Sequence, residues 1–126
     1  MPERRHQYRE IGPWNHEDVE RAIRTDDIEA LRLAVIGVSM HDDDWRYAQD
    51  LCVRLSSHAH FNVRGNAVLG FGHIARVHGQ LDRTLVQPII QGALRDENDY
   101  IRGQADCAKD DTALFLKWHY DEPDVA

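Results

Sequence analysis

Residues that interrupt regular structure are scarce in this sequence, which holds four prolines and eight glycines among 126 residues. So few of them argue against a disordered or collagen-like chain. Hydrophobic residues make up 42% and charged residues 29%, enough apolar side chains for a core and enough charge for solubility. A chain of this length suits one domain and is too short for two independent cores.

Long apolar stretches are also missing. No window approaches the ~18 apolar residues that would span a membrane. The first residues, Met1 to His6, are polar, unlike a signal peptide. We therefore expect a cytoplasmic protein with no membrane contact.

Cysteine is limited to Cys52 and Cys107, which lie far apart in the sequence. Their separation matches no zinc or redox motif. Because each lies in a segment with helical apolar periodicity, we interpret both as buried small hydrophobic residues rather than as a disulfide.

Positive charge is the minority sign: 15 Lys and Arg stand against 22 Asp and Glu, a formal net charge of −7. An acidic domain repels phosphate backbones. The densest basic stretch, Arg4-Arg5, lies in the N-terminal end. We therefore expect no nucleic-acid partner, and the acidity favours a basic protein instead.

The motifs of common catalytic and metal sites are absent as well. The sequence lacks a His-Glu-x-x-His motif, a nucleophile elbow and a glycine-rich phosphate loop after a strand. His73 and His78 miss the three- or four-residue spacing that places two ligands on one helix face. His58 and His60 have no third ligand at a suitable spacing. We expect no enzyme activity, no metal and no cofactor.

What is present is helical periodicity. Apolar residues recur at three- and four-residue spacing in six segments, and no alternating run indicates a strand. We expect one helical domain over 15–118, between an irregular N-terminal segment, 1–14, and a polar tail, 119–126. The spacing predicts helices near residues 15–25, 26–41, 44–55, 62–79, 82–95 and 98–118.

Residues with known preferences for helix ends support these boundaries. Asn15, Asn62 and the acidic run at 42–44 are predicted N-caps, because their side chains accept hydrogen bonds from free backbone N–H groups. Gly79 is predicted to end the fourth helix. Pro88 lies inside the fifth, which we expect either to bend there or to begin later. The residues of that helix expected to face the core are Leu85, Ile89, Ile90 and Ala93.

An internal repeat is the most informative feature. Residues 48–67 align with residues 86–105 at a constant offset of 38. Each copy holds a helix, a short polar loop and the start of a second helix. Such a helix pair cannot bury its apolar face alone and must stack on a neighbour. The identical pairs are Gln49 and Gln87, Arg64 and Arg102, Gly65 and Gly103, and Ala67 and Ala105.

The segments at 62–67 and 100–105 resemble the start of the second helix of a HEAT repeat, where a valine-arginine pair is followed by small residues. The resemblance covers residues 44–118 and extends weakly to 15–40. It implies an all-α fold, a short α-solenoid of about three antiparallel helix pairs. It also implies that Arg64 and Arg102 bridge to acidic groups of the neighbouring loop, Asp96 or Asp99.

The chain is similar to small acidic HEAT-like proteins of bacteria. Some of these are immunity proteins that neutralise a toxin delivered by a neighbouring cell, in contact-dependent inhibition or a similar system. The resemblance implies a stoichiometric protein-binding module that covers the active surface of a basic toxin domain. An alternative is a scaffold or regulatory adaptor within a larger complex, and a less favoured one is a helical-repeat lyase or glycosylase.

The expected binding surface is the exposed side of the two helices that begin near Asn62 and Tyr100, rimmed by the acidic loop before Trp45. Aromatic side chains ringed by carboxylates combine apolar anchors with electrostatic steering of a basic partner. The alternative is that the acidic loop only caps a helix and that Trp45 packs in the core. The predicted partner-binding residues are Asp42, Asp43, Asp44, Trp45, Asn66, His73, Tyr100, Gln104, Asp110 and Asp111.

Overall fold

The computed structural model describes residues 11–120, and the first ten and last six residues lie outside that range. The described chain forms six α-helices and no strand, which confirms the predicted all-α class. Within this range, no helix has the length and apolar character needed to cross a membrane. The helices are α2 (His16–Thr25), α3 (Ile28–His41), α4 (Trp45–Leu55), α5 (Phe61–His78), α6 (Arg83–Ala93) and α7 (Asp99–Leu116).

Side chains cap most helix starts. Asn15 and Asp27 each accept a backbone N–H from the first turn of α2 and α3. Asp44 and Asn98 do the same for α4 and α7, each with two N–H groups. These contacts satisfy donors that the helices themselves leave unpaired.

The start of α5 differs from the prediction. Asn62 is the predicted N-cap, which would start the helix at residue 63, but α5 begins two residues earlier, at Phe61. His60 caps the helix, because its ring Nδ1 accepts the Asn62 N–H at 3.2 Å. Asparagine is the commoner cap, so residue preference alone favours the wrong position. At the other end Gly79 terminates α5 as predicted, with a φ of +65°.

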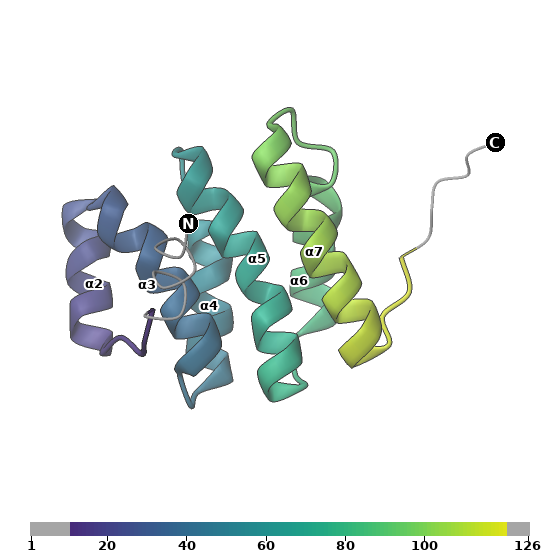
Figure 1. Cartoon of the computed structure of the whole chain (residues 1–126), viewed down its shortest axis with the longest axis horizontal. Helices are drawn as coiled ribbons and strands as arrows, with labels where there is room; N and C mark the ends of the chain where they lie inside the picture. The colour runs from purple at the N-terminus through teal and green to yellow at the C-terminus, as the bar shows by residue number, and fades with distance from the viewer. Residues whose placement is uncertain (1–10, 121–126) are drawn as a thin grey trace, which may run out of the picture.

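The helices form two rows along the long axis of the molecule (Figure 1). In the first row α5 packs between α3 and α7, and its contact with α7 is the most extensive in the structure. The second row is α2, α4 and α6, each packed against the helix that follows it in the chain. In contrast to α5 and α7, α4 and α6 make little or no direct contact.

The core fills the space between the two rows. Glycine lets α5 approach its neighbours closely: a Cβ at Gly70 would lie 2.5 Å from Ser39 Oγ and 2.6 Å from Cys52 Sγ. The interior therefore has no room for a methyl group at this point. The largest fully buried side chains are Phe71 and Ile74 from α5, Leu31 from α3, Leu51 from α4, Ile90 from α6 and Ile101 from α7.

Helix α6 corrects one prediction about the core. Pro88 lies inside the helix, which nevertheless runs from Arg83 to Ala93. Ile90 and Ala93 are buried as expected, but Leu85 is 44% exposed and Ile89 is half-buried. Ile89 packs at the edge of the core and lines a cleft, whereas Leu85, one turn earlier on the same side of the helix, lies outside the core.

Short segments before α2 and after α7 pack on the helices. Residues 11–14 are irregular, as predicted, and lie against α3, where the Trp14 ring and the Gly12 carbonyl crowd Gly37. After α7, Lys117 adopts a left-handed conformation and Trp118 folds back to 7% exposure.

The predicted polar tail includes residues 119 and 120, and these two pack on the domain. Gln87 Nε2 donates to the His119 carbonyl at 2.8 Å, and the hydroxyls of Tyr120 and Thr112 lie 2.7 Å apart. The rest of the tail, and residues 1–10 with Arg4-Arg5, lie outside the described residues.

The two cysteines have different environments and are both free thiols. Cys52 is buried as predicted, whereas Cys107 is exposed, so its predicted burial is wrong. The buried stripe of α7 follows Ile101, Ala105 and Ala108. Cys107 lies about 200° around the helix from Ala105, at 100° per residue, and is therefore outside that stripe.

The tight fit of Gly70 predicts opposite effects for two equal substitutions. We expect Gly70→Ala to lower the free energy of unfolding by about 1–3 kcal/mol, because the new methyl group overlaps Ser39 and Cys52. Gly103→Ala, on an exposed helical position with open space around it, should raise it by up to about 1 kcal/mol. Urea unfolding measures both, and equal effects of the two variants would contradict this packing.

Candidate functional site

Three predicted site residues meet in one hydrogen-bond network. The Tyr100 hydroxyl donates to Asn66 Oδ1, and Gln104 Nε2 lies 3.0 Å from the Tyr100 hydroxyl oxygen. Asn66 Nδ2 in turn donates to the Arg32 backbone carbonyl at 3.0 Å. Asn66 is only 7% exposed. These side chains therefore hold α3, α5 and α7 together. They lie at the base of the surface that these three first-row helices form.

An aromatic cluster lies beside this network. Phe61 packs edge-on against the Tyr100 ring at 5.8 Å between centroids, and His60 stacks on Phe61 at 5.2 Å. Tyr100 itself covers Gly65, where an added Cβ would lie 2.7 Å from the ring. Phe61 remains 41% exposed. The network thus has an accessible aromatic edge.

His73 and Asp111 occupy the middle of the same surface, on α5 and α7. Burial, and then the positive charge of Arg76, lower the pKa of His73 to about 4. Arg76 Nη2 lies 2.8 Å from His73 Nδ1. Burial raises the pKa of the Asp111 carboxyl, against the opposing charge of Arg76. At neutral pH His73 is therefore uncharged and its Nδ1 accepts a hydrogen bond.

The exposed side of α7 carries further carboxylates. Five exposed residues recur there at four- and three-residue spacing, and we call them the α7 stripe. The Leu114 side chain, 60% exposed, is the most accessible large hydrophobic residue of the described chain. The α7 stripe consists of Asp99, Gly103, Asp106, Asp110 and Leu114.

The repeat explains where the α7 stripe lies in the fold. At the offset of 38, Gly65 and Gly72 of α5 correspond to Gly103 and Asp110 of α7. On α5 these two glycines receive Tyr100 and Asp111 from the next helix pair. The α7 stripe therefore corresponds to the side of α5 that packs against α7.

Cys107, beside the stripe, is poorly suited to nucleophilic chemistry. Burial raises the pKa of its thiol, and so do the carboxylates of Asp111, Asp110 and Asp106. The thiolate is the reactive form of cysteine. The surroundings of Cys107 thus keep it in the unreactive thiol form.

The acidic loop at 42–44 lies at the other end of α5. Asp44 caps α4, and Asp42 contacts His16 at 2.6 Å and accepts the Asp44 N–H at 2.8 Å. The Asp42 carbonyl contacts His78, at the C-terminal end of α5, whereas Tyr100 lies at its N-terminal end. An 18-residue helix is about 27 Å long. The structure therefore does not bring this loop together with Tyr100.

The other two residues of the predicted rim, Asp43 and Trp45, differ in how far they are exposed. Asp43 is exposed. Trp45 is half-buried against the core and has the Arg46 guanidinium 4.7 Å from its ring centroid. Most of this predicted rim thus has a structural role, because Asp44 caps α4 and Trp45 packs partly against the core.

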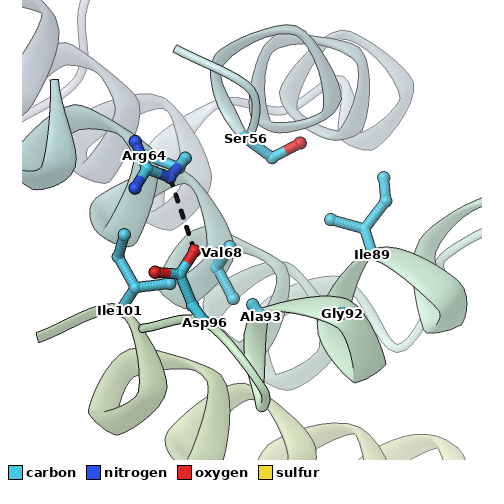
Figure 2. Close-up of a pocket in the computed structure, with 8 residues that line it drawn as sticks. All are labelled: Ser56, Arg64, Val68, Ile89, Gly92, Ala93, Asp96 and Ile101. Carbon is cyan, nitrogen blue, oxygen red and sulfur yellow. Dashed lines mark ion pairs between the residues drawn. The ribbon is translucent and has the colours of Figure 1, made fainter. Parts of the chain in front are cut away.

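A cleft of about 210 Å³ opens between α5, α6, the start of α7 and Ser56, the residue that follows α4 (Figure 2). At one side Arg64 Nε lies 3.8 Å from Asp96 Oδ2, which confirms the bridge expected for Arg64. Arg102 likewise pairs with Asp99 and donates to the Asp96 carbonyl at 2.6 Å. The cleft is lined by Ser56, Arg64, Val68, Ile89, Gly92, Ala93, Asp96 and Ile101.

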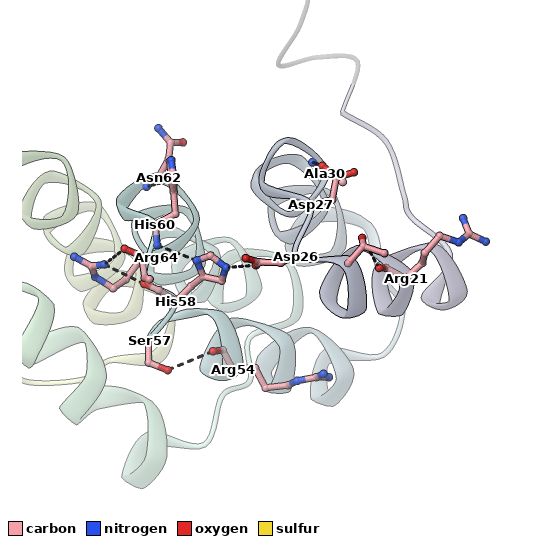
Figure 3. A network of polar contacts seen from close by, with 12 residues as sticks. Arg21, Asp26, Asp27, Ala30, Arg54, Ser57, His58, His60, Asn62 and Arg64 are labelled. Carbon is pink, nitrogen blue, oxygen red and sulfur yellow. Dashed lines mark hydrogen bonds and ion pairs between the residues drawn. The ribbon is translucent and has the colours of Figure 1, made fainter.

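His58 and His60 make hydrogen bonds that stabilise the loop between α4 and α5 (Figure 3). His58 Nδ1 accepts the His60 N–H at 2.9 Å, so its other nitrogen donates to Asp26 at 2.7 Å. Both ring nitrogens of His58 are thereby used within the protein. Among the residues that the structure describes, no three His, Cys, Asp or Glu side chains are grouped to hold a metal ion.

Comparisons with known proteins give no match: no family model, curated protein or solved structure matches this chain. The function is therefore inferred from the geometry and charge of the chain itself.

Sequence reasoning missed two features of this site. Asp106 and Leu114 complete the α7 stripe with Asp110, and their helical spacing was a usable signal. The cleft has no such signal, because it depends on the distance between two helices that are not neighbours in the chain.

The half-buried position of His73, beside Arg76, predicts an unusual titration. We expect its imidazole to titrate near pH 4, and Arg76→Gln to raise that pKa only part of the way, because burial remains. The unfolded histidine takes its proton near pH ~6.5, so this contribution to stability is complete above that pH and is lost as the pH falls toward 4. Histidine NMR signals measure the titration. A midpoint near 6.5, or an equal shift in Arg95→Gln, would contradict this assignment.

Proposed function

We propose that this protein is a short solenoid of three antiparallel helix pairs that binds one basic protein through the α7 stripe. In this proposal it acts in the cytoplasm as an immunity protein, neutralising a basic toxin domain by covering its active surface. It supplies no chemistry of its own.

The helix contacts support the solenoid arrangement. Consecutive helices pack as the pairs α2 with α3, α4 with α5 and α6 with α7. Successive pairs then join through the first row, where α5 contacts both α3 and α7. Each pair buries its apolar face against the next, as in helical-repeat proteins.

The observation that carries the binding proposal is the open packing surface on α7. Where α5 presents glycines to the next helix, α7 presents Gly103 and exposed carboxylates, and nothing in the described chain covers them. Asp106 and Asp110 would attract a basic partner, while Leu114 offers an apolar anchor at the end of the same stripe. Phe115, 42% exposed, extends the apolar end.

A simpler role for the carboxylates is to end the stack, since terminal repeats need a polar outer surface. That role explains Asp106 and Asp110. It does not explain the exposure of Leu114 and Phe115 beside them, which favours an interface.

Charge-reversal variants test the proposal. We expect Asp106→Lys and Asp110→Lys each to weaken capture of a basic partner about tenfold at low salt, because steering is lost and like charges face each other. Asp50→Lys, on the exposed side of α4, makes the same charge change away from the stripe and is the matched control. Quantitative mass spectrometry of proteins captured from the native organism compares the three variants with the wild type.

The captured protein then decides the biological role. A single basic protein, lost with the α7 variants and kept with Asp50→Lys, should arrest growth when expressed alone and should be harmless when co-expressed with this chain. Several subunits of one larger complex would instead favour the adaptor. Equal capture by all variants would rule out the α7 stripe.

A further inference from the structure

The gap between the second-row helices α2 and α4 is bridged by side chains. The Tyr47 hydroxyl donates to Glu20 Oε2 at 3.0 Å, and the Arg54 guanidinium contacts both Glu20 oxygens at 3.4 Å. His16 stacks on the Tyr47 ring at 3.6 Å between centroids. A phenol and a guanidinium thus share one carboxylate at this junction.

The next gap, between α4 and α6, lacks the matching side chains. At the offset of 38, Leu85 stands where α4 has Tyr47, and Gly92 stands where α4 has Arg54. Leu85 is 44% exposed, and a Cβ added at Gly92 would meet no atom within 4 Å. This gap is therefore open on the α6 side, and the cleft lies there.

The cleft already holds two of the three groups seen at the first junction. Asp96 is its carboxylate and Arg64 is the guanidinium that faces it, on the side opposite Ile89 in Figure 2. The apolar lining comes from Val68, Ile89, Ala93 and Ile101. The missing group is the phenol.

We propose that this cleft receives a tyrosine side chain from a protein partner. Its volume of about 210 Å³ exceeds the roughly 150 Å³ of a cavity that accepts benzene. The ring would rest on Ile89, and its hydroxyl would donate to Asp96. Asp96 accepts only the Asn98 N–H among the hydrogen bonds to its carboxylate that the structure gives, and a carboxylate has about four acceptor positions.

The charge of Arg64 decides between a tyrosine and a basic side chain. Arg64 already neutralises Asp96, so a second cation would be repelled, whereas a neutral hydroxyl would not. A phenylalanine would fill the apolar part but leave the carboxylate without a new donor. That the tyrosine belongs to a protein partner rests on the proposed protein-binding function. The preference of the cleft for a phenol does not.

The test uses p-cresol, the side-chain analogue of tyrosine, in an NMR titration of the ¹⁵N-labelled full chain. We expect saturable shifts at Ser56, Gly92, Ala93 and Asp96, and the same shifts with the capped peptide acetyl-Gly-Tyr-Gly-amide. The capped Gly-Phe-Gly peptide should bind about tenfold more weakly, because it lacks the hydroxyl. Asp96→Asn should reduce this preference for tyrosine.

Two glycine variants provide the matched control. Gly92→Leu should abolish the shifts by filling the cleft, and Gly103→Leu, an equal change at another open helical position, should leave them intact. Equal binding by both variants, shifts away from the cleft, or equal affinity for the two peptides would overturn the proposal. If p-cresol binds but the tyrosine peptide does not, the proposal that the phenol belongs to a protein partner is wrong. Because no partner is needed, these failures are separate from failure of the α7 capture experiment.

Discussion

The close approach of α5 to α7 is the contact on which the rest of the structure depends. It requires glycine at 65 and 72, since a side chain there would collide with Tyr100 and Asp111. The Tyr100 hydroxyl then reaches Asn66, which carries the connection on to α3. Because the first row is drawn together, the second-row helices are left apart, and the space between α4 and α6 follows from that geometry.

This packing divides the polar side chains into two groups with different uses. Asn66, Tyr100 and Gln104 satisfy one another inside the first row, where an unpaired group would cost about 1–3 kcal/mol. Asp106 and Asp110 lie on the outer side of α7 in water. The residues that most resemble a polar binding site are thus structural, and the residues available to a partner are the carboxylates at the end of the stack.

Apolar spacing predicted which segments are helical, because it records the side of each helix that faces the core. It also placed Asn66 and Gln104, equivalent positions of the repeat, on one surface. It could not say what lies beside a helix. Leu85 and Ile89 fit an apolar stripe as well as Ile90 does, yet Leu85 is exposed and Ile89 is only half-buried at the edge of the core. The cap at His60 was missed for a local reason, since the commoner cap Asn62 is only two residues away.

The two second-row gaps show why the repeat need not be uniform. Between α2 and α4, Glu20, Tyr47 and Arg54 complete a contact that ties the first pair to the second. Between α4 and α6, Gly92 has no side chain at the position that matches Arg54, and Leu85, at the position that matches Tyr47, is exposed. Gly92 is the second-to-last residue of α6, and no close contact requires a glycine there. The junction of α4 and α6 therefore lacks the phenol and the guanidinium that join α2 to α4, and in our proposal the tyrosine of a partner takes the place of that phenol.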